Sequence, residues 1–206
     1  MVTSFYSKCI GCNFEKVFKK KGYAYFKNGA YNLNIIGIRK NNNNVVTNLF
    51  DDYLVVIYKT PNGAEHRNIY SITTEPGLYY MTNKSTNPKG TAILVPGQYR
   101  GCWQIGKHQG KYTALCQKKP VKVYRDNNFD KVYNLNSSTI QEGIFGINIH
   151  RSNEYGSSSQ INKWSAGCQV FSDVKDYNAF MYLCKKQAEL YGNNFTYTLI
   201  NESDLL

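Results

Sequence analysis

Short runs that alternate between apolar and polar residues dominate the chain and predict a fold built mainly of β-strands. The runs are rich in Val, Ile and Tyr, and turn residues such as Pro61-Asn62-Gly63 and Pro88-Lys89-Gly90 separate them. Many short strands between such turns are typical of a β-sandwich or barrel. The expected strands are 31–38, 53–58, 68–73, 91–95, 120–124, 145–150 and 195–200.

One segment near the C-terminus has helical periodicity instead. Asp173 suits the N-cap of a helix, and Gly192 suits its C-terminal stop. Between them, apolar side chains recur every three or four residues from Val174 to Tyr191. We therefore expect one C-terminal amphipathic helix, with Cys184 among its core residues.

The first 30 residues do not follow the strand pattern. They contain the pair Cys9 and Cys12 and the basic cluster 19–21. A zinc site would need a second Cys pair at suitable spacing, and a thioredoxin-like site would need a βαβ context; the sequence offers neither. The expected organisation is an N-terminal appendage of unknown role (1–30) and one domain (31–206), without a metal or another cofactor.

The net charge of the chain restricts the classes of possible binding partner only in part. The 206 residues include 25 Lys and Arg against 14 Asp and Glu, a formal net charge of +11. This excess of positive charge would attract an anionic partner such as nucleic acid, an anionic cell surface or a polyanionic wall, or it could simply keep the protein soluble. The basic residues form no stripe of the kind expected for a groove-binding helix. The sequence contains no run of eighteen apolar residues, so it predicts no membrane-spanning helix. The N-terminus has no apolar stretch of the kind found in export signals.

The strongest chemical signal is a His and a Cys on either side of a polar loop. Alternation along the expected strand 145–150 places His150 at its end, on the same face as Asn148. The loop 151–163 follows, and the chain returns into an apolar run at Cys168. A thiol beside an imidazole suits nucleophilic catalysis, because the imidazole accepts the thiol proton. The alternative is a structural Cys buried after a tight turn.

Residues around this pair have expected roles of their own. Gly167 allows a backbone conformation that a side chain would block, and the amides of Gly167 and Cys168 are candidate oxyanion donors. Ser165 is expected to hydrogen-bond the imidazole or the substrate. A further group is expected to contact the substrate, although His108 also fits a surface loop and Trp164 also fits simple packing. The group is Asn148, Arg151, Trp164, Gln169 and His108.

His150, the loop and Ser165-Ala-Gly-Cys168 resemble the signature of the YkuD-type L,D-transpeptidase catalytic-domain family. That signature is a His followed at about this spacing by Ser/Thr-His-Gly-Cys. Blocks further upstream are similar to a phage-encoded branch of the family, so the resemblance extends over about residues 31–191. These blocks are 31–39, 73–77, 87–94, 96–99, 106–115 and 125–126.

The resemblance implies a β-sandwich or barrel-like catalytic domain that acts on peptidoglycan stem peptides. Cys168 would form a thioester with His150 as the base. Water as the acceptor gives an L,D-carboxypeptidase or endopeptidase, which we prefer, and an amine gives an L,D-transpeptidase. The chain departs from the family at Ala166, where a second His is common, and at Val170, where Arg or Asn is usual. Without the second His, His150 would carry all the acid–base work. Arg151 and Gln169 are candidate replacements for the Arg or Asn that is missing at Val170, which would brace the loop and hold a substrate carboxylate.

The resemblance also implies a phage lysis or virion-associated enzyme. Such a protein would be made in the bacterial host cytoplasm without a signal peptide. It would act at the cell wall after release or as a virion component, with the anionic envelope and other virion proteins as partners. The alternatives are a catalytically inactive wall-binding or virion structural protein on the same fold, and a nucleic-acid binder. Papain-like peptidases and sortases fit poorly, because no His follows Cys168 and no Arg follows Arg151.

Overall fold

The chain folds into two β-sheets, with one long helix across the larger sheet. The computed structural model describes residues 4–83 and 87–205. The mainly β class predicted from the sequence is confirmed. The strands are β1 (Asn34–Arg39), β2 (Asp52–Lys59), β3 (Glu65–Thr73), β4 (Thr91–Leu94), β5 (Gly97–His108), β6 (Tyr112–Gln117), β7 (Val121–Asp126), β8 (Gln141–Gly143), β9 (Ile149–Arg151), β10 (Gln169–Phe171) and β11 (Phe195–Asn201).

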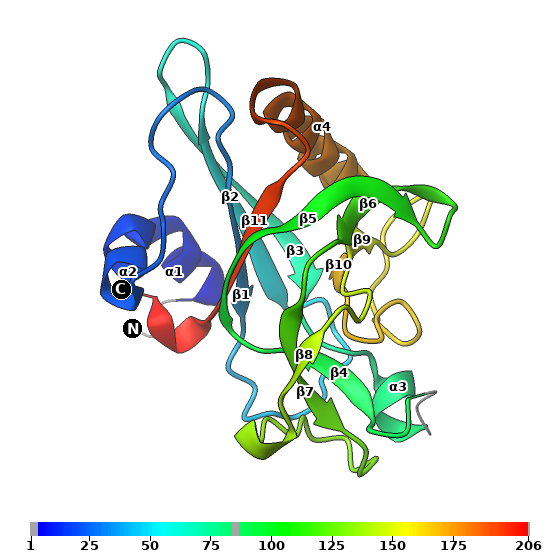
Figure 1. Ribbon diagram of the computed structural model, residues 1–206. Coiled ribbons are helices and arrows are strands. Elements are labelled where there is room, and N and C mark those ends of the chain that lie inside the picture. Colours follow the sequence, from blue (N-terminus) through cyan, green and yellow to red (C-terminus); the bar gives the residue numbers. More distant parts are fainter. Residues whose placement is uncertain (1–3, 84–86, 206) are drawn as a thin grey trace.

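The larger sheet closes on itself. In the described residues its strands form a barrel in the order β1-β11-β5-β6-β9-β10-β3-β2 (Figure 1). β11 runs parallel to β1 and antiparallel to β5, so the last strand of the chain completes the wall beside the first. Leu54, Trp103 and Leu199 belong to a core cluster of buried side chains that this wall contributes. The second sheet has the order β4-β7-β8.

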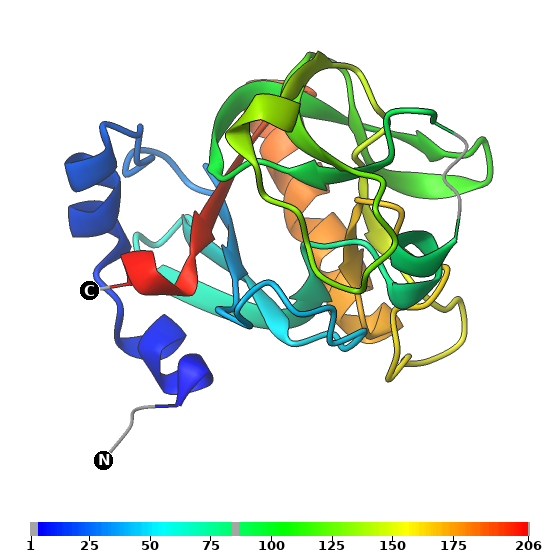
Figure 2. The ribbon, with the colours of Figure 1, turned by 90° about the horizontal axis from the view of Figure 1, so that it is seen from below.

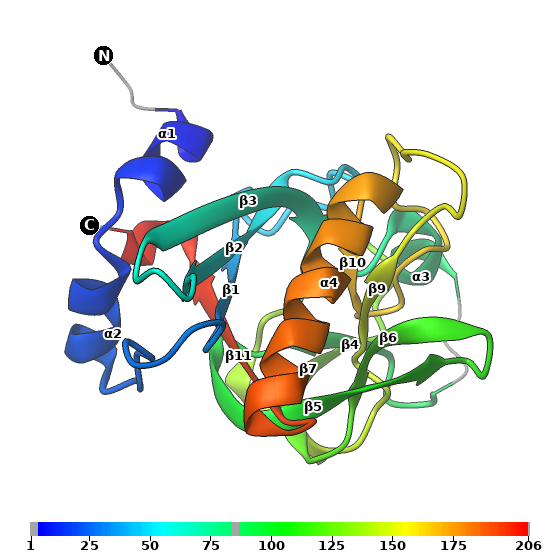
Figure 3. The same cartoon turned by 90° about the horizontal axis from the view of Figure 1, so that it is seen from above.

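The predicted C-terminal helix is α4 (Val174–Tyr191), with the expected bounds. The Asp173 side chain accepts hydrogen bonds from the amides of the first turn, and Gly192 follows the last turn with φ 80°. Phe180 and Cys184 are fully buried against the barrel core. Figure 3 shows α4 lying across one end of the barrel. Burying this face is what fixes the helix on the sheet.

Further helices lie outside the sequence prediction. They are α1 (Phe5–Gly11), α2 (Phe14–Lys21), α3 (Leu78–Thr82) and the short 3-10 helices η1 (Ser137–Thr139) and η2 (Glu202–Asp204). In residues 4–83 and 87–205, no helix is long and apolar enough to cross a membrane.

Residues 4–30 pack against the outside of the barrel. Phe14 and Phe18 of α2 form a second core with apolar side chains of β1, β2 and β11, including Ile36 and Ile200. Cys9 belongs to this core, and burial raises the pKa of its thiol to about 12. Figure 2 shows α1 and α2, in blue, on the same flank as the red C-terminal η2. The ion pairs Lys8–Glu202 and Lys21–Asp204, both 2.8 Å long, join the two ends of the chain there.

The strand expected at 145–150 forms only in part. Residues 149–151 make β9, whereas 145–148 leave the sheet geometry because Gly146 has φ 72°. The side chain of Gln117 accepts hydrogen bonds from the amides of Phe145 and Ile147 and so takes the place of a neighbouring strand. β5 and β6 were not among the predicted strands, because β5 is polar and interrupted by glycines and neither strand has a regular alternation of apolar and polar residues.

Candidate active site

The pairing of two short strands brings the segments that carry Cys168 and His150 side by side. β9 and β10 run parallel, with Ile149 opposite Gln169 and His150 opposite Val170. The Gln169 amide also donates to the carbonyl of the residue before Ile149, at 2.9 Å. Cys168 lies two residues before Val170, so the period of a strand places its side chain on the face that His150 occupies. The predicted juxtaposition of a strand end and a returning strand is present.

The thiol of Cys168 rests in its neutral form. It is half-buried and donates a hydrogen bond to the Gly146 carbonyl, with 3.3 Å between Sγ and O. Burial raises the pKa of Cys168 to about 11, although the backbone amide of Asn148 acts in the opposite direction. Within the described residues no hydrogen bond joins this thiol to the His150 imidazole. The resting pair is therefore not a thiolate–imidazolium ion pair.

The imidazole of His150 is held in one orientation. It is 3% exposed, and its Nδ1 lies 2.8 Å from the Arg151 carbonyl oxygen and 3.0 Å from the Tyr112 hydroxyl. A backbone carbonyl only accepts, so Nδ1 carries the ring proton and Nε2 keeps its lone pair. Burial, followed by the neighbouring His108, lowers the pKa of His150 to about 3. A neutral imidazole with a fixed tautomer has a lone pair free to accept a proton, although the lowered pKa makes it a weaker base than an exposed His.

His108 lies against His150 and is not on the surface. It ends β5, is 8% exposed, and stacks its ring on that of His150 with centroids 4.0 Å apart and planes 18° apart. The Asn148 side-chain amide lies 3.0 Å from His108 Nδ1. Burial, with a smaller contribution from Lys111, lowers the pKa of His108. A second imidazole thus stands beside His150, supplied by β5 and not by the motif position that holds Ala166.

The turn 165–168 is braced from within. Ser165 is fully buried, donates to the Cys168 carbonyl at 2.8 Å and accepts from the Gly167 amide at 3.1 Å. It therefore fixes the turn and does not hydrogen-bond the imidazole. Gly167 has φ 121°, and a Cβ there would lie 2.3 Å from the carbonyl oxygen of Ala92. Only glycine fits this position.

The same hydrogen bond changes the expected oxyanion donors. The Gly167 amide is already engaged by Ser165. In residues 4–83 and 87–205 the Cys168 amide has no acceptor, so it is the donor available to a developing negative charge. Its position next to Sγ suits a carbonyl carbon attacked by that sulfur.

The expected substrate contacts divide into two groups. Gln169 is fully buried, with its Oε1 accepting from the Tyr197 hydroxyl at 2.7 Å and its Nε2 donating to the Gly167 carbonyl at 3.3 Å, so it supports the turn from the core. Val170 is also fully buried. Asn148 contacts His108, as described above. Arg151 and Trp164 line a cavity beside His150.

Two cavities reach the motif. The first has a volume of about 550 Å³ and includes His150, Arg151 and Trp164 in its lining, with the positive charges of Lys111 and Lys163. The Arg151 guanidinium lies 4.2 Å from the centre of the Tyr112 ring and 3.2 Å from the Glu154 carboxylate. These contacts hold its charge at the cavity wall.

The second cavity, about 570 Å³, is lined among others by Tyr79, Phe145 and Ala166. Arg125 brings a positive charge to it and lies 4.6 Å from the centre of the Phe145 ring. Each cavity therefore offers space for a substrate chain and a positively charged side chain that could contact it, one beside Trp164 and the other beside Ala166.

Three residues that hold the segment 143–150 in place were not predicted from the sequence. Gln117 of β6 donates from its side chain to the Gly143 carbonyl and from its backbone amide to Asn148 Oδ1, both at 2.9 Å. The Trp103 indole donates to the Ile147 carbonyl at 2.7 Å. Tyr112 holds His150, as described above. All three lie on β5 or β6, more than 30 residues before His150, and no motif connects them to it.

No metal centre is indicated, because the described residues contain no cluster of three or more His, Cys, Asp or Glu side chains that could hold an ion. Comparison of the chain with protein-family models, curated proteins and solved structures gives no match.

Proposed function

We propose that the protein is a cysteine-dependent acyltransferase or hydrolase of the YkuD-type L,D-transpeptidase kind, acting on peptidoglycan stem peptides. One observation carries the proposal. Cys168 directly precedes β10, whose Val170 pairs with His150 of the adjacent parallel strand β9, and the Arg151 carbonyl holds the His150 Nδ1 proton, leaving Nε2 as the base. The barrel with α4 across it would be this family's catalytic domain.

The first half of the reaction forms a thioester. Cys168 Sγ attacks the carbonyl carbon of the peptide bond while His150 Nε2 takes the thiol proton. The carbonyl oxygen becomes an oxyanion that accepts a hydrogen bond from the Cys168 amide. When the tetrahedral intermediate collapses, the carbon–nitrogen bond breaks and the His150 imidazolium returns the proton to the leaving amine. The enzyme then carries the acyl group on sulfur.

The second half releases the acyl group. His150 Nε2 removes a proton from water or from an amine, which attacks the thioester carbonyl, and the thiolate leaves and is reprotonated. Water yields a carboxylate, as in an L,D-carboxypeptidase or endopeptidase, and an amine yields a new peptide bond. We favour hydrolysis. Because both resting groups are neutral, proton transfer accompanies formation of the sulfur–carbon bond and does not precede it.

Charge around the site supports a peptide that carries carboxylates. Arg151 and Lys163 line one cavity and Arg125 the other, and a guanidinium pairs favourably with a carboxylate. The net charge of +11 also favours association with an anionic envelope. We propose that the protein is phage-encoded and made in the bacterial host cytoplasm. It would act at the wall after release, or as a virion component beside other virion proteins.

A second candidate function is a catalytically inactive wall-binding or virion structural protein. The raised pKa of the Cys168 thiol favours it, because reactive cysteines usually have lowered pKa values. Ala166, at the position of the family's second His, also favours it. The stacked His108 and the available Cys168 amide favour the enzyme instead, since a binding protein needs neither.

Muropeptide analysis separates the two functions. Purified walls of several chemotypes are incubated with wild type, with Cys168→Ala and with the control Cys102→Ala, and the products are identified by mass spectrometry. The enzyme produces shortened stem peptides with wild type and with the control, and none with Cys168→Ala. Circular dichroism checks that each variant is folded. Unchanged muropeptides with wild type on every wall would leave only the binding function.

A further inference from the structure

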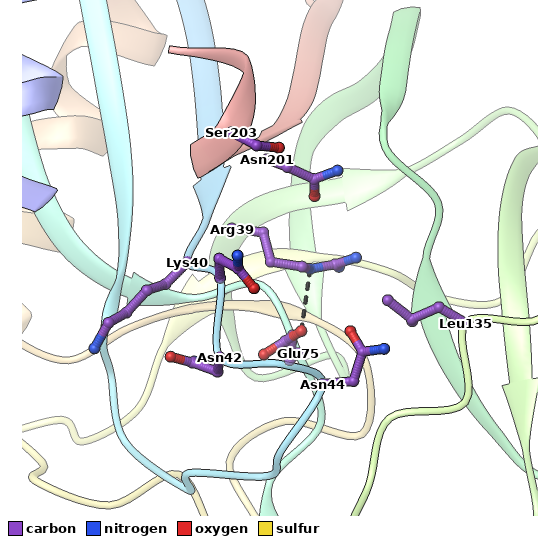
Figure 4. A pocket seen from close by; sticks show the side chains of 9 residues that line it. Arg39, Lys40, Asn42, Asn44, Glu75, Leu135, Asn201 and Ser203 are labelled. Atoms are coloured by element: carbon purple, nitrogen blue, oxygen red, sulfur yellow. Dashed lines mark ion pairs between the residues drawn. The ribbon is translucent and has the colours of Figure 1, made fainter.

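A polar cavity lies away from Cys168, where β1 and β11 end. It has a volume of about 190 Å³ and shares no lining residue with the two cavities that reach the motif. Arg39, Glu75 and Ser203 contribute to its wall, together with the amide side chains of Asn44 and Asn201. Figure 4 shows the Arg39 side chain reaching between Asn201 and Glu75.

Arg39 carries a buried guanidinium that is only partly satisfied. The residue is 3% exposed, its Nε donates to Thr74 Oγ1 at 3.1 Å, and its Nη2 donates to the carbonyls of Thr74 and Leu94 at 3.0 Å. Nη1 has no hydrogen-bond partner among the described residues. A buried donor without an acceptor is costly, so it marks a place where an acceptor would be held strongly.

The positive charge of Arg39 is only weakly balanced by the carboxyl groups near it. Glu75 Oε1 lies 3.3 Å from Nε, but burial raises the pKa of Glu75 to about 8, so the carboxyl is largely protonated at neutral pH. Burial likewise raises the pKa of Asp52, to about 6. Lys40 extends away from the cavity, with its ammonium 3.4 Å from Asp51. Arg39 is thus the cation that faces this space.

We propose that this cavity binds a phosphate group, with Arg39 Nη1 as its charged donor and Asn44, Asn201 and Ser203 as neutral donors. A guanidinium edge ringed by amides and a hydroxyl offers more donors than a carboxylate has oxygens, and it matches the several oxygens of a phosphate. A protonated Glu75 adds a further O–H donor. This site does not depend on the activity proposed for Cys168.

The test resolves the site residue by residue, because a chain of this charge binds phosphate weakly at many places. Inorganic phosphate and, separately, glycerol 3-phosphate are titrated into the ¹⁵N-labelled full chain at constant ionic strength, and amide shifts are followed by NMR. We expect saturable shifts confined to residues 39–44, 75 and 201–204. Binding of both ligands identifies phosphate carried on a larger molecule, and binding of inorganic phosphate alone identifies the free ion.

Matched variants test the assigned donors. Asn44 and Asn43 are adjacent and both have positive φ, which glycine tolerates, but only Asn44 lines the cavity. Asn44→Gly combined with Ser203→Ala should weaken binding about ten-fold, the effect of losing two hydrogen bonds. Asn43→Gly should bind as wild type does. Shifts that do not saturate, or equal weakening by Asn44→Gly/Ser203→Ala and Asn43→Gly, would overturn the proposal.

Discussion

The imidazole of His108 stacks on the imidazole of His150, with ring centroids 4.0 Å apart. The two rings come from β5 and β9, 42 positions apart in the sequence (150 − 108). Burial lowers the pKa of both rings, and each ring has one nitrogen fixed by a hydrogen bond, His108 by Asn148 and His150 by the Arg151 carbonyl. The base of the proposed reaction is therefore positioned by a second imidazole, whose own charge would oppose protonation of His150.

The pH profile should reflect this pairing. Because the pKa of His150 is lowered to about 3, the basic form is present well below pH 6.5, and kcat/KM should stay high down to about pH 5. His108→Phe keeps a stacked ring but removes the neighbouring charge, so the acidic limb should move upward. Steady-state rates between pH 3 and 9 measure it. An acidic limb near 6.5 in both proteins would contradict the assigned environment.

Cys168 should be slow to alkylate at neutral pH. The thiolate is the reacting form, and burial raises the pKa of this thiol to about 11. The rate of iodoacetamide modification, mapped to Cys168 by peptide mass spectrometry, should rise with pH through 9 and show no plateau below it. Rapid alkylation with a plateau between pH 6 and 8 would instead indicate a preformed thiolate–imidazolium pair.

Gly167→Ala should destabilise the fold. The substitution places a Cβ 2.3 Å from the Ala92 carbonyl oxygen at φ 121°, so the turn must move. We expect the free energy of unfolding to fall by about 2–4 kcal/mol in urea titrations. Gly11→Ala is the matched control, because a Cβ at Gly11 meets nothing within 4 Å and its φ is ordinary. Equal stability of the two variants would refute the tight packing at Gly167.

Glu75 should make stability fall as pH rises. Its pKa is about 8 in the fold against 4.5 when exposed, so the folded state holds a proton that the unfolded state releases. This contribution is complete below pH 4.5 and is lost as pH rises through 8, with each unit of pKa shift worth about 1.4 kcal/mol. In urea titrations between pH 4.5 and 9, the difference in unfolding free energy between wild type and Glu75→Gln should decline steadily. A constant difference would show that Glu75 is ionised in the fold.

Sequence reasoning succeeded where the pattern is local. The helix 174–191 has a cap, a periodic apolar face and a terminal glycine within one segment. The return of the chain beside the strand of His150, after the loop and at Cys168, was likewise predicted from residues that are close in the sequence. It could not place His108, because the stack depends on how β5 meets β9 across the barrel. It also did not reveal that Ser165 and Gln169 hydrogen-bond within the turn and the core, since a polar side chain in a motif does not indicate whether it faces a turn or a ligand.

The central claim is that Cys168 carries the acyl group. Its most direct test is intact-protein mass spectrometry of wild type mixed with purified muropeptides and quenched in acid during turnover. We expect a mass increase equal to the stem peptide minus its leaving group, mapped to Cys168 and absent from Cys168→Ala. His150→Ala should show little or no adduct. Turnover of muropeptides without an adduct, or with an adduct on any other residue, would contradict the account.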